Sequence, residues 1–422
     1  MKRYLITLAL AACSSSLLAA TVLECDRLID VENGKVLEDR QILIDGNRIA
    51  AVGKTVDAPG DAERIGLGTC LPGLMDMHVH LDMEMSPEAY IKRFQANPTD
   101  YALMAAHFGN KTLQAGFTTV RHPGDSNNST IALRNAIEEG FATGPRVFTA
   151  GKSLATTGGH ADPTNGYRHD LMGKPGPEDG VLNGVESARE AVRQRYKDGA
   201  DFIKITATGG VLSLAKSGQN PQFSDEELEA VIQTATDYGM HVAAHAHGTE
   251  GMKRAVRAGV RSIEHGTFMD DETIDLMKKM GTYYVPTILA GRYVAEKSQI
   301  EGFFPEVVRP KAAAVGPQIQ GTFEKAYKAG VTIAFGTDCG VSPHGSNAME
   351  FVYMVESGMP EMEAIQSATT VSAQLLGVEN ELGSISEGKL ADIVAVDGNP
   401  LENISLLTDI GFVMKDGVVY RQ

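Results

Sequence analysis

Apolar and polar residues alternate with a period of two at both ends of the chain, which predicts short β-strands joined by tight turns. Asn-Gly and Asp-Gly pairs, which tight hairpin turns require, separate the apolar runs. These turn signals are Glu32-Asn33-Gly34, Asp45-Gly46-Asn47 and Asp416-Gly417. A lone hairpin is only marginally stable. We therefore expect residues 21–71 and 383–422 to combine into one small β-sandwich domain.

Residues 72–382 show a different pattern, in which helices with one apolar face alternate with short apolar strands. Each helix is followed by a glycine that breaks it, often after a small residue. The next strand begins within three residues of this glycine. The predicted strands lie at 118–121, 202–206, 241–245, 262–265, 283–287 and 332–335, with two more near Met75 and Val147. Eight alternating units with short connections favour a (β/α)8 TIM barrel. The alternative, an open doubly wound sheet, lacks a Gly-x-Gly-x-x-Gly motif after an early strand.

One helix shows the local signals clearly. Ser224 and Glu227 form a capping box, and Gly239 provides a glycine at the far end. Between them, apolar residues recur at the spacing of one buried helix face. These residues are Leu228, Val231, Ile232 and Ala235.

The first twenty residues have the pattern of an export signal. Lys2 and Arg3 form a positive segment, and the apolar run that follows is too short for a good spanning helix. The sequence leaves two cleavage sites open for this signal. The segment at 10–13 resembles a bacterial lipobox, in which Cys13 would carry a lipid anchor, and the other end follows Ala20. We exclude residues 1–20 from the fold and expect an exported, periplasmic protein, attached to the outer membrane in the lipobox case.

Composition and charge narrow the classes of function. The chain has 422 residues, 43% of them hydrophobic, which is enough for a large core. A net charge of −16 makes nucleic acid a poor partner and weakly favours cationic substrates. The sequence leaves the oligomeric state open, a homo-oligomer included.

Three cysteines remain beyond the export signal, at Cys25, Cys70 and Cys339. Their spacing matches neither a zinc finger nor a disulfide framework. In an oxidising compartment a bridge between Cys25 and Cys70 is open, and buried free thiols are equally compatible with the sequence.

Histidines and an aspartate gather at the predicted carboxyl ends of the barrel strands, where the active site of such a barrel lies. His78 and His80 are two residues apart on one strand, so both imidazoles point the same way. Three further residues occupy equivalent positions, namely His245, His265 and Asp338. Imidazole and carboxylate are ligands for zinc and similar ions. A hydrogen-bonded core histidine would explain one such residue, but four together favour a metal site.

Lys204 is the unusual member of this set. It lies inside a predicted strand between Ile203 and Ile205, so we expect it to be buried. A buried ammonium is costly unless it is paired or neutralised, and as a cation it would repel metals. Pairing with a nearby aspartate is an alternative that the spacing leaves open.

Together these motifs resemble those of the amidohydrolase superfamily, in particular its binuclear-metal carboxypeptidase and prolidase-like branch, which is related to imidazolonepropionase. The resemblance covers essentially the whole chain after residue 20, and the combination of motifs is specific. The motifs are Pro72-Gly-Leu-Met-Asp-Met-His-Val-His80, Ile203-Lys-Ile205, Ala244-His-Ala-His-Gly248, Ile263-Glu-His-Gly266, Gly336-Thr-Asp338 and Gly388-Lys-Leu-Ala-Asp-Ile393.

The resemblance implies two divalent metal ions, zinc being the first choice, and a CO2-derived carbamate on Lys204 that bridges them. The remaining ligands fall into two sets by position. These sets are His78, His80 and Asp338 for one metal, and His245 and His265 for the other. In this family a hydroxide that bridges the metals is the nucleophile. Asp338 would accept its proton and pass it to the leaving amine.

The resemblance also implies substrate contacts. His160 corresponds to a family histidine that contacts the substrate or its developing oxyanion, which would make it catalytic. His247 corresponds to a position that binds the substrate's α-carboxylate. For each, a loop histidine with a local hydrogen bond is the alternative. The chain departs from the family at His122, where relatives often carry aspartate, so no role is assigned there.

The expected function is that of an exported carboxypeptidase or dipeptidase, which cleaves the C-terminal amide bond of a short peptide or N-acyl amino acid. The acidic charge weakly favours C-terminal Lys or Arg. Related activities form the alternatives: Xaa-Pro peptides, aromatic amides such as ochratoxin, and cyclic-amide or imidazolone hydrolysis in the same fold. A scaffold without metal is a further alternative, and the complete set of six ligands argues against it.

Overall fold

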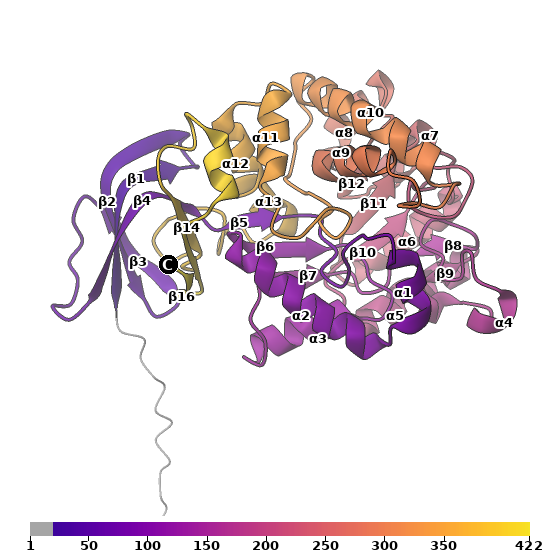
Figure 1. Ribbon diagram of the computed structural model, residues 1–422, viewed down its shortest axis with the longest axis horizontal. Coiled ribbons are helices and arrows are strands. Elements are labelled where there is room, and N and C mark those ends of the chain that lie inside the picture. Colours follow the sequence, from indigo (N-terminus) through magenta and orange to yellow (C-terminus); the bar gives the residue numbers. More distant parts are fainter. Residues whose placement is uncertain (1–19) are drawn as a thin grey trace, which may run out of the picture.

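The computed structural model describes residues 20–422 and has two parts, a β-sheet at one side and a larger body of strands and helices (Figure 1). Predictions that fall on residues 1–19, the lipid-anchored Cys13 among them, lie outside the described residues. Within residues 20–422, the helices are all too short or too polar to cross a membrane.

Strands from both ends of the chain form one seven-stranded sheet, in the order β16-β15-β14-β4-β1-β2-β3. The two ends meet where β14 pairs antiparallel with β4, with Ile393 opposite Pro72. The strands are β1 (Thr21–Asp30), β2 (Lys35–Asp45), β3 (Arg48–Gly53), β4 (Glu63–Pro72), β14 (Ile393–Val396), β15 (Phe412–Lys415) and β16 (Val418–Arg421). The predicted combination of both chain ends is thus present. The division of this sheet into a two-layer sandwich stays a prediction.

The sheet packs its inner side chains into an apolar core that contains the disulfide Cys25–Cys70. These cysteines lie on the neighbouring strands β1 and β4, with their Cα atoms 5.9 Å apart. The sequence left this pairing open, and the structure contains the bridge. Cys339 is a buried free thiol in the barrel.

The larger body is built around parallel strands that follow one another as predicted. Two groups are continuously hydrogen-bonded, β5-β6-β7 and β10-β11-β12-β13. Their bounds are β5 (Leu74–Asp76), β6 (Phe117–His122), β7 (Arg146–Thr149), β10 (Ile203–Thr206), β11 (Val242–Ala246), β12 (Ser262–His265) and β13 (Tyr283–Val285). Isolated bridges extend these groups, and the bridge between Val79 and Cys339 closes the circle. Leu154 pairs with Ile205 on one side, and Ile333 pairs with Tyr284 on the other.

The eighth strand position, predicted at 332–335, is irregular. Ile333 forms a single parallel bridge, and the Met77 amide donates to the Phe335 carbonyl at 2.9 Å, so this segment links β13 to the chain after β5. The expected regular strand is absent from it, because the Phe335 amide donates to the Ser367 carbonyl at the end of a helix instead of to a neighbouring strand. The barrel therefore closes through scattered bonds at this point.

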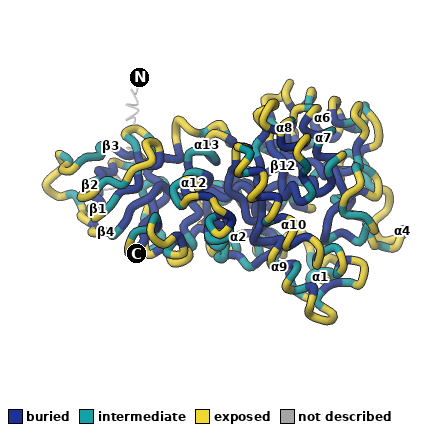
Figure 2. The backbone as a smooth tube through the Cα atoms, turned by 90° about the horizontal axis from the view of Figure 1, so that it is seen from above, coloured by how far each residue is buried: buried dark blue, intermediate teal, exposed yellow. Residues whose placement is uncertain are grey.

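Helices surround the barrel, and Figure 2 shows buried backbone inside and exposed backbone on the outer helices and loops. The capping box of α6 is confirmed, since Ser224 Oγ accepts the Glu227 amide and Gly239 follows with φ +73°. The longer helices are α2 (Pro98–Gln114), α3 (Ser129–Glu138), α5 (Val185–Asp198), α6 (Asp225–Asp237), α7 (Thr249–Ala258), α8 (Asp271–Met280), α9 (Ile288–Lys297) and α10 (Arg309–Lys328). The shorter elements are α1 (Ala89–Gln95), α4 (His169–Met172), α11 (Met349–Glu356), α12 (Glu361–Ser367), α13 (Thr370–Leu376), β8 (Ala155–Thr156), β9 (Val181–Leu182), η1 (Pro177–Asp179) and η2 (Ile404–Thr408).

Candidate metal centre

His78 and His80 lie just beyond β5, where the chain bends at Met77 and Val79 forms an isolated parallel bridge with Cys339, so the strand ends earlier than the sequence predicted. The Met77 amide donates to Phe335 and the Val79 amide donates to Arg121, at 2.9 and 3.1 Å. These two amides reach opposite neighbours, so the segment departs from a regular strand, yet Nε2 of both histidines faces the same Asp338 oxygen. Their ring centroids lie 5.4 Å apart, which agrees with the alternation predicted from the sequence.

The first group of ligand-type side chains consists of His78, His80 and Asp338. The Oδ1 atom of Asp338 lies 3.6 Å from Nε2 of His78 and 3.4 Å from Nε2 of His80. This oxygen is buried and has no hydrogen-bond partner among residues 20–422. Burial raises the pKa of Asp338 to about 8, although the nearby Lys204 charge lowers it. An unpartnered carboxylate oxygen facing two imidazole nitrogens is a donor set that fits a divalent cation.

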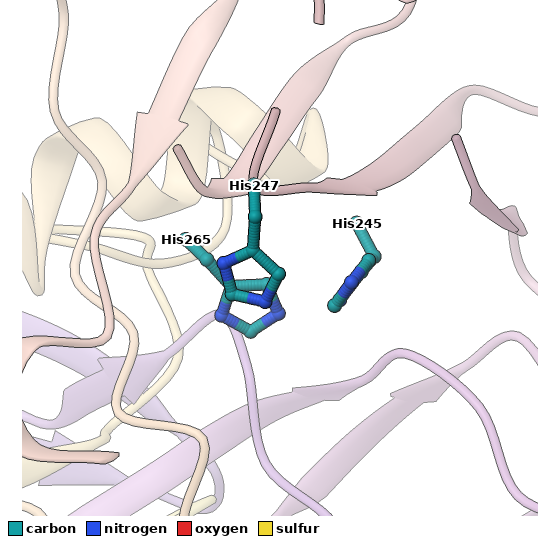
Figure 3. Close-up of side chains that lie close together, drawn as sticks. All are labelled: His245, His247 and His265. Atoms are coloured by element: carbon teal, nitrogen blue, oxygen red, sulfur yellow. The ribbon is translucent and has the colours of Figure 1, made fainter. Parts of the chain in front are cut away.

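The second group consists of His245, His247 and His265, whose ligand atoms lie within 4.8 Å of one another. Figure 3 shows the rings of His247 and His265 overlapping, with His245 beside them. The ring centroids of His247 and His265 are 5.0 Å apart, and those of His245 and His265 are 4.7 Å apart. The sequence predicted that His247 binds the substrate. In the structure its ring lies next to those of the two predicted metal ligands, His245 and His265.

Lys204 is buried on β10 and influences both groups. Burial lowers the pKa of all four predicted histidine ligands, and the Lys204 charge lowers it further in both groups. Burial in turn lowers the pKa of Lys204 to about 8, against the opposing pull of the carboxylates of Glu264 and Asp338. Lys204 is thus within electrostatic reach of both groups, and its role as a bridging ligand stays a prediction. These two carboxylates act on Lys204 through their charge, while their own close contacts are with His78, His80 and Arg121.

Outer hydrogen bonds fix the orientation of the His78 ring. Its Nδ1 donates to Oε2 of Glu264 at 2.8 Å, and the other oxygen of Glu264 accepts from Arg121 at 2.7 Å. All three side chains are buried. A partner on Nδ1 sets the tautomer and leaves Nε2 for a metal. Sequence reasoning missed Glu264 and Arg121, although a buried charge in each of two strands was a usable sign that they need partners.

Two other predicted ligands are held in the same way. His80 Nδ1 lies 3.0 Å from the Gly124 carbonyl, and His265 Nδ1 lies 2.8 Å from the Thr287 hydroxyl. Each contact leaves Nε2 as the nitrogen that faces the site. His245 differs, because its Nε2 lies 3.2 Å from the Gly209 carbonyl.

The backbone around the site is strained. His265, Thr287 and Asp338 have φ values of 69°, 55° and 57°, in the left-handed region that residues other than glycine rarely adopt. Each such residue costs about 1–3 kcal/mol, and such residues cluster at active sites and ligand clamps. The two predicted ligands here are therefore held in conformations that the surrounding fold must enforce.

His160 reaches the same site from the loop after β8. Its ring stacks on that of His245, with centroids 4.3 Å apart. Its Nδ1 is buried without a hydrogen-bond partner in the described part of the chain, and burial lowers its pKa to about 3. A Cβ at Gly210 would overlap this ring, so the close approach requires glycine. The predicted substrate histidine thus lies against a predicted ligand with one nitrogen free.

A cationic side chain lies behind this side of the site. The Lys311 ammonium from α10 donates to the carbonyls of Gly210, Ser213 and Ala215 at 3.1, 2.7 and 2.8 Å. Burial lowers the pKa of His160 and His247, and the Lys311 charge lowers it further. These bonds fasten the loop after β10 and bring positive charge close to both predicted substrate histidines.

Comparison with known proteins adds to this geometry. The protein-family model described as "Amidohydrolase family" matches residues 69–421. Ochratoxinase from Aspergillus niger is 32% identical over 414 residues, which are 92% of this chain and 84% of that protein. The crystal structure of a Xaa-Pro dipeptidase with bound methionine is similar with a TM-score of 0.91 and 57% identity, covering 96% of this chain and 100% of that one. A prolidase complexed with N-methylphosphonate-L-proline is similar with a TM-score of 0.88 and 33% identity, covering 96% and 100%.

Proposed function

The chain belongs to the amidohydrolase family and is a hydrolase acting on amide bonds, and we propose that it cleaves the C-terminal amide bond of dipeptides or N-acyl amino acids. The observation that carries this proposal is the pair of ligand groups around Lys204 at one end of the barrel. Strained backbone, unpartnered buried atoms and perturbed pKa values coincide there, as is typical of active sites.

The proposal includes two divalent ions, zinc being the first choice. His78, His80 and Asp338 would hold one ion, His245 and His265 the other, and a carboxylated Lys204 would lie between them. Carboxylation needs the neutral amine, and the lowered pKa of Lys204 supports it. When bound, the ions would polarise the scissile carbonyl and lower the pKa of a bound water towards about 7.

Asp338 is suited to move the proton. Its unpartnered Oδ1 and its raised pKa allow the carboxylate to accept a proton near neutral pH and to donate it to the leaving amine. His160 is suited to bind the substrate oxygen, since its free Nδ1 would act as a hydrogen-bond donor in one tautomer. Both roles use side chains that the fold holds buried and in place.

The substrate's α-carboxylate fits the side of the site near Lys311. His247 and His160 lie there, and the Lys311 charge acts on both. A carboxylate would gain from this positive potential and from the imidazole N–H groups. This arrangement supports a free C-terminal carboxylate next to the cleaved amide, and it gives no local support to the preference for Lys or Arg that the net charge suggested.

The names of the relatives order the candidate substrates. The Xaa-Pro dipeptidase at 57% identity supports dipeptides first, and proline in the C-terminal position among them. Ochratoxinase at 32% identity supports aromatic amides with a carboxylate as a second class. The two classes share the C-terminal carboxylate and differ in the group that fills the pocket beside it.

The decisive experiment measures cleavage of matched substrates by the metal-loaded protein. A panel of Met-Xaa dipeptides and N-acetyl-Xaa acids varies the C-terminal residue among Pro, Phe, Lys and Arg, and each carboxylate is paired with its C-terminal amide. We expect cleavage of the carboxylates with a large loss for the matched amides. Lys204→Ala is the inactive control, with partial recovery by a small carboxylate. Failure to cleave any member of the panel would reject the carboxypeptidase proposal.

We also propose that the protein is exported. The disulfide Cys25–Cys70 supports this proposal, because such bridges persist in oxidising compartments. Cell fractionation of the full chain, followed by mass spectrometry of its mature N-terminus, tests it. A lipidated Cys13 is expected for the lipobox and an unmodified N-terminus after Ala20 for simple cleavage. An intact Met1 in the cytoplasmic fraction contradicts export.

A further inference from the structure

A third group of ligand-type side chains lies beside the first. It consists of His80, Asp82 and His122, whose ligand atoms lie within 4.8 Å of one another. Asp82 is two residues beyond His80, and His122 is the last residue of β6, the strand next to β5. The ring centroids of His80 and His122 are 5.2 Å apart. Two of these three residues have no part in the centre proposed above.

His122 is buried in an unusual state. Its side chain has no exposed surface, and neither Nδ1 nor Nε2 has a hydrogen-bond partner within residues 20–422. A buried polar group without a partner costs about 1–3 kcal/mol, so most such groups are bonded. The fold thus tolerates an imidazole with both nitrogens unused, which points to a partner other than the described side chains.

Asp82 is the nearest acidic group, and it does not satisfy the imidazole. Its Oδ1 lies 3.3 Å from Nε2 of His122, yet this nitrogen still lacks a hydrogen bond of acceptable direction. Asp82 is itself only 6% exposed. A carboxylate oxygen and an imidazole nitrogen that approach without bonding each other are the arrangement expected around a shared cation.

We propose that Asp82 and His122, with His80 at their border, form an additional divalent-cation site beside the binuclear centre. One imidazole and one carboxylate suit zinc and other borderline ions, with water completing the shell. His80 contacts the Gly124 carbonyl through Nδ1, so only its Nε2 is free, and this nitrogen also faces Asp338. His80 can therefore serve one ion at a time, which makes the additional site weaker than the other two.

This sharing has a functional consequence. An ion held by Asp82 and His122 would compete for His80 with the ion held by His78 and Asp338. Excess zinc should then lower activity by disturbing the centre, at concentrations above those that fill it. Removal of Asp82 or His122 should abolish this inhibition while leaving the activity at low zinc.

Zinc-buffered equilibrium dialysis with metal analysis tests the proposal on the folded protein. We expect two tightly bound zinc ions per chain and a third that binds at higher free zinc. His122→Asn and the isosteric Asp82→Asn should each reduce uptake from three ions to two and remove inhibition by excess zinc. The matched control is His107→Asn, an exposed histidine on α2, which should keep all three ions.

The outcomes separate this proposal from the proposed function. Wild-type protein that never exceeds two ions, or variants that still bind three, would overturn the additional site. Variants that lose every ion while near-ultraviolet circular dichroism shows an intact fold would also overturn it, because Asp82 and His122 would then belong to the main centre. Wild-type protein that binds three ions and cleaves no peptide would reject the proposed function and keep the site.

Discussion

The mouth of the barrel and the core of the flanking sheet both bury most of their side chains, but they are built from opposite kinds of side chain. The sheet core is apolar, and its members include Leu23, Ile42, Ile393, Phe412 and Met414. The barrel mouth buries charged or titratable groups, and its members include His78, Lys204, Glu264, His265 and Asp338. Burial of each large apolar side chain contributes about 1.5–3 kcal/mol to folding, whereas burial of a charge is costly without a partner.

This difference separates stability from function within one chain. Burial lowers the pKa of Lys204 to about 8 and raises that of Asp338 to about 8, so both leave their ordinary ranges. Both shifts arise because burial at the barrel mouth destabilises the charged forms of these side chains relative to water. Changes in the mouth should therefore alter metal binding and activity, and changes in the sheet core should alter the free energy of unfolding.

The largest expected effect is at Lys204. In Lys204→Met we expect activity to fall by about 10³-fold or more, because loss of a metal centre removes about 4 kcal/mol or more of transition-state stabilisation. The metal-free variant should be at least as stable as metal-free wild type, because a costly buried cation is gone. Peptide cleavage and thermal unfolding measure the two quantities. A variant that keeps its activity but unfolds at a lower temperature than wild type would contradict the assignment of function to the barrel mouth and of stability to the sheet core.

The matching change in the sheet removes the disulfide. The bridged residues are 45 positions apart, and a closed loop of this length stabilises the fold by about 2–4 kcal/mol. We expect the double variant Cys25→Ala, Cys70→Ala to lose this amount in denaturant unfolding and to keep the activity of each folded molecule. The reduced wild type should behave like the variant. A loss of activity below the unfolding transition would contradict the separation of the two regions.

A smaller effect is expected at Glu264, which orients His78 through a hydrogen bond of 2.8 Å. Glu264→Gln keeps the size of the side chain and removes its charge. We expect metal affinity to fall by about 10–100-fold. Mutating a residue that hydrogen-bonds the second ring nitrogen of a metal-binding histidine has effects of this size. Competition with a chelator measures the affinity. Unchanged affinity would contradict the proposed role of Glu264 in orienting His78 for the metal.

The smallest effect concerns pH. The neutral amine of Lys204 is the form that reacts with CO2, and its pKa of about 8 means that the neutral fraction rises with pH and levels off above that value. At a fixed concentration of dissolved CO2, metal-free protein should regain activity about tenfold faster per pH unit below 8. Reloading with zinc at pH 6.5, 7.5 and 8.5 tests this. A rate that is flat across this range would count against carboxylation.

Much of the fold could be predicted because its signals are local. The period-two pattern and the glycine turns located β1, β2 and β3, and the capping box located α6. Alternation placed His78 and His80 on one side, as their close rings agree. The segment at 332–335 could not be predicted in detail, because its bonds depend on Ser367, a partner far along the chain.

The sequence by itself determined the kinds of residue at the barrel mouth and the order of the elements that carry them. Side-chain chemistry and periodicity depend only on residues that are close together in the chain. Only the tertiary structure decided which distant residues meet. It joined Cys25 to Cys70, placed Glu264 behind His78, and brought His122 to Asp82. These contacts follow from the register and closure of strands, which fix side chains far apart in the chain to within a few ångströms, and no local pattern encodes that distance.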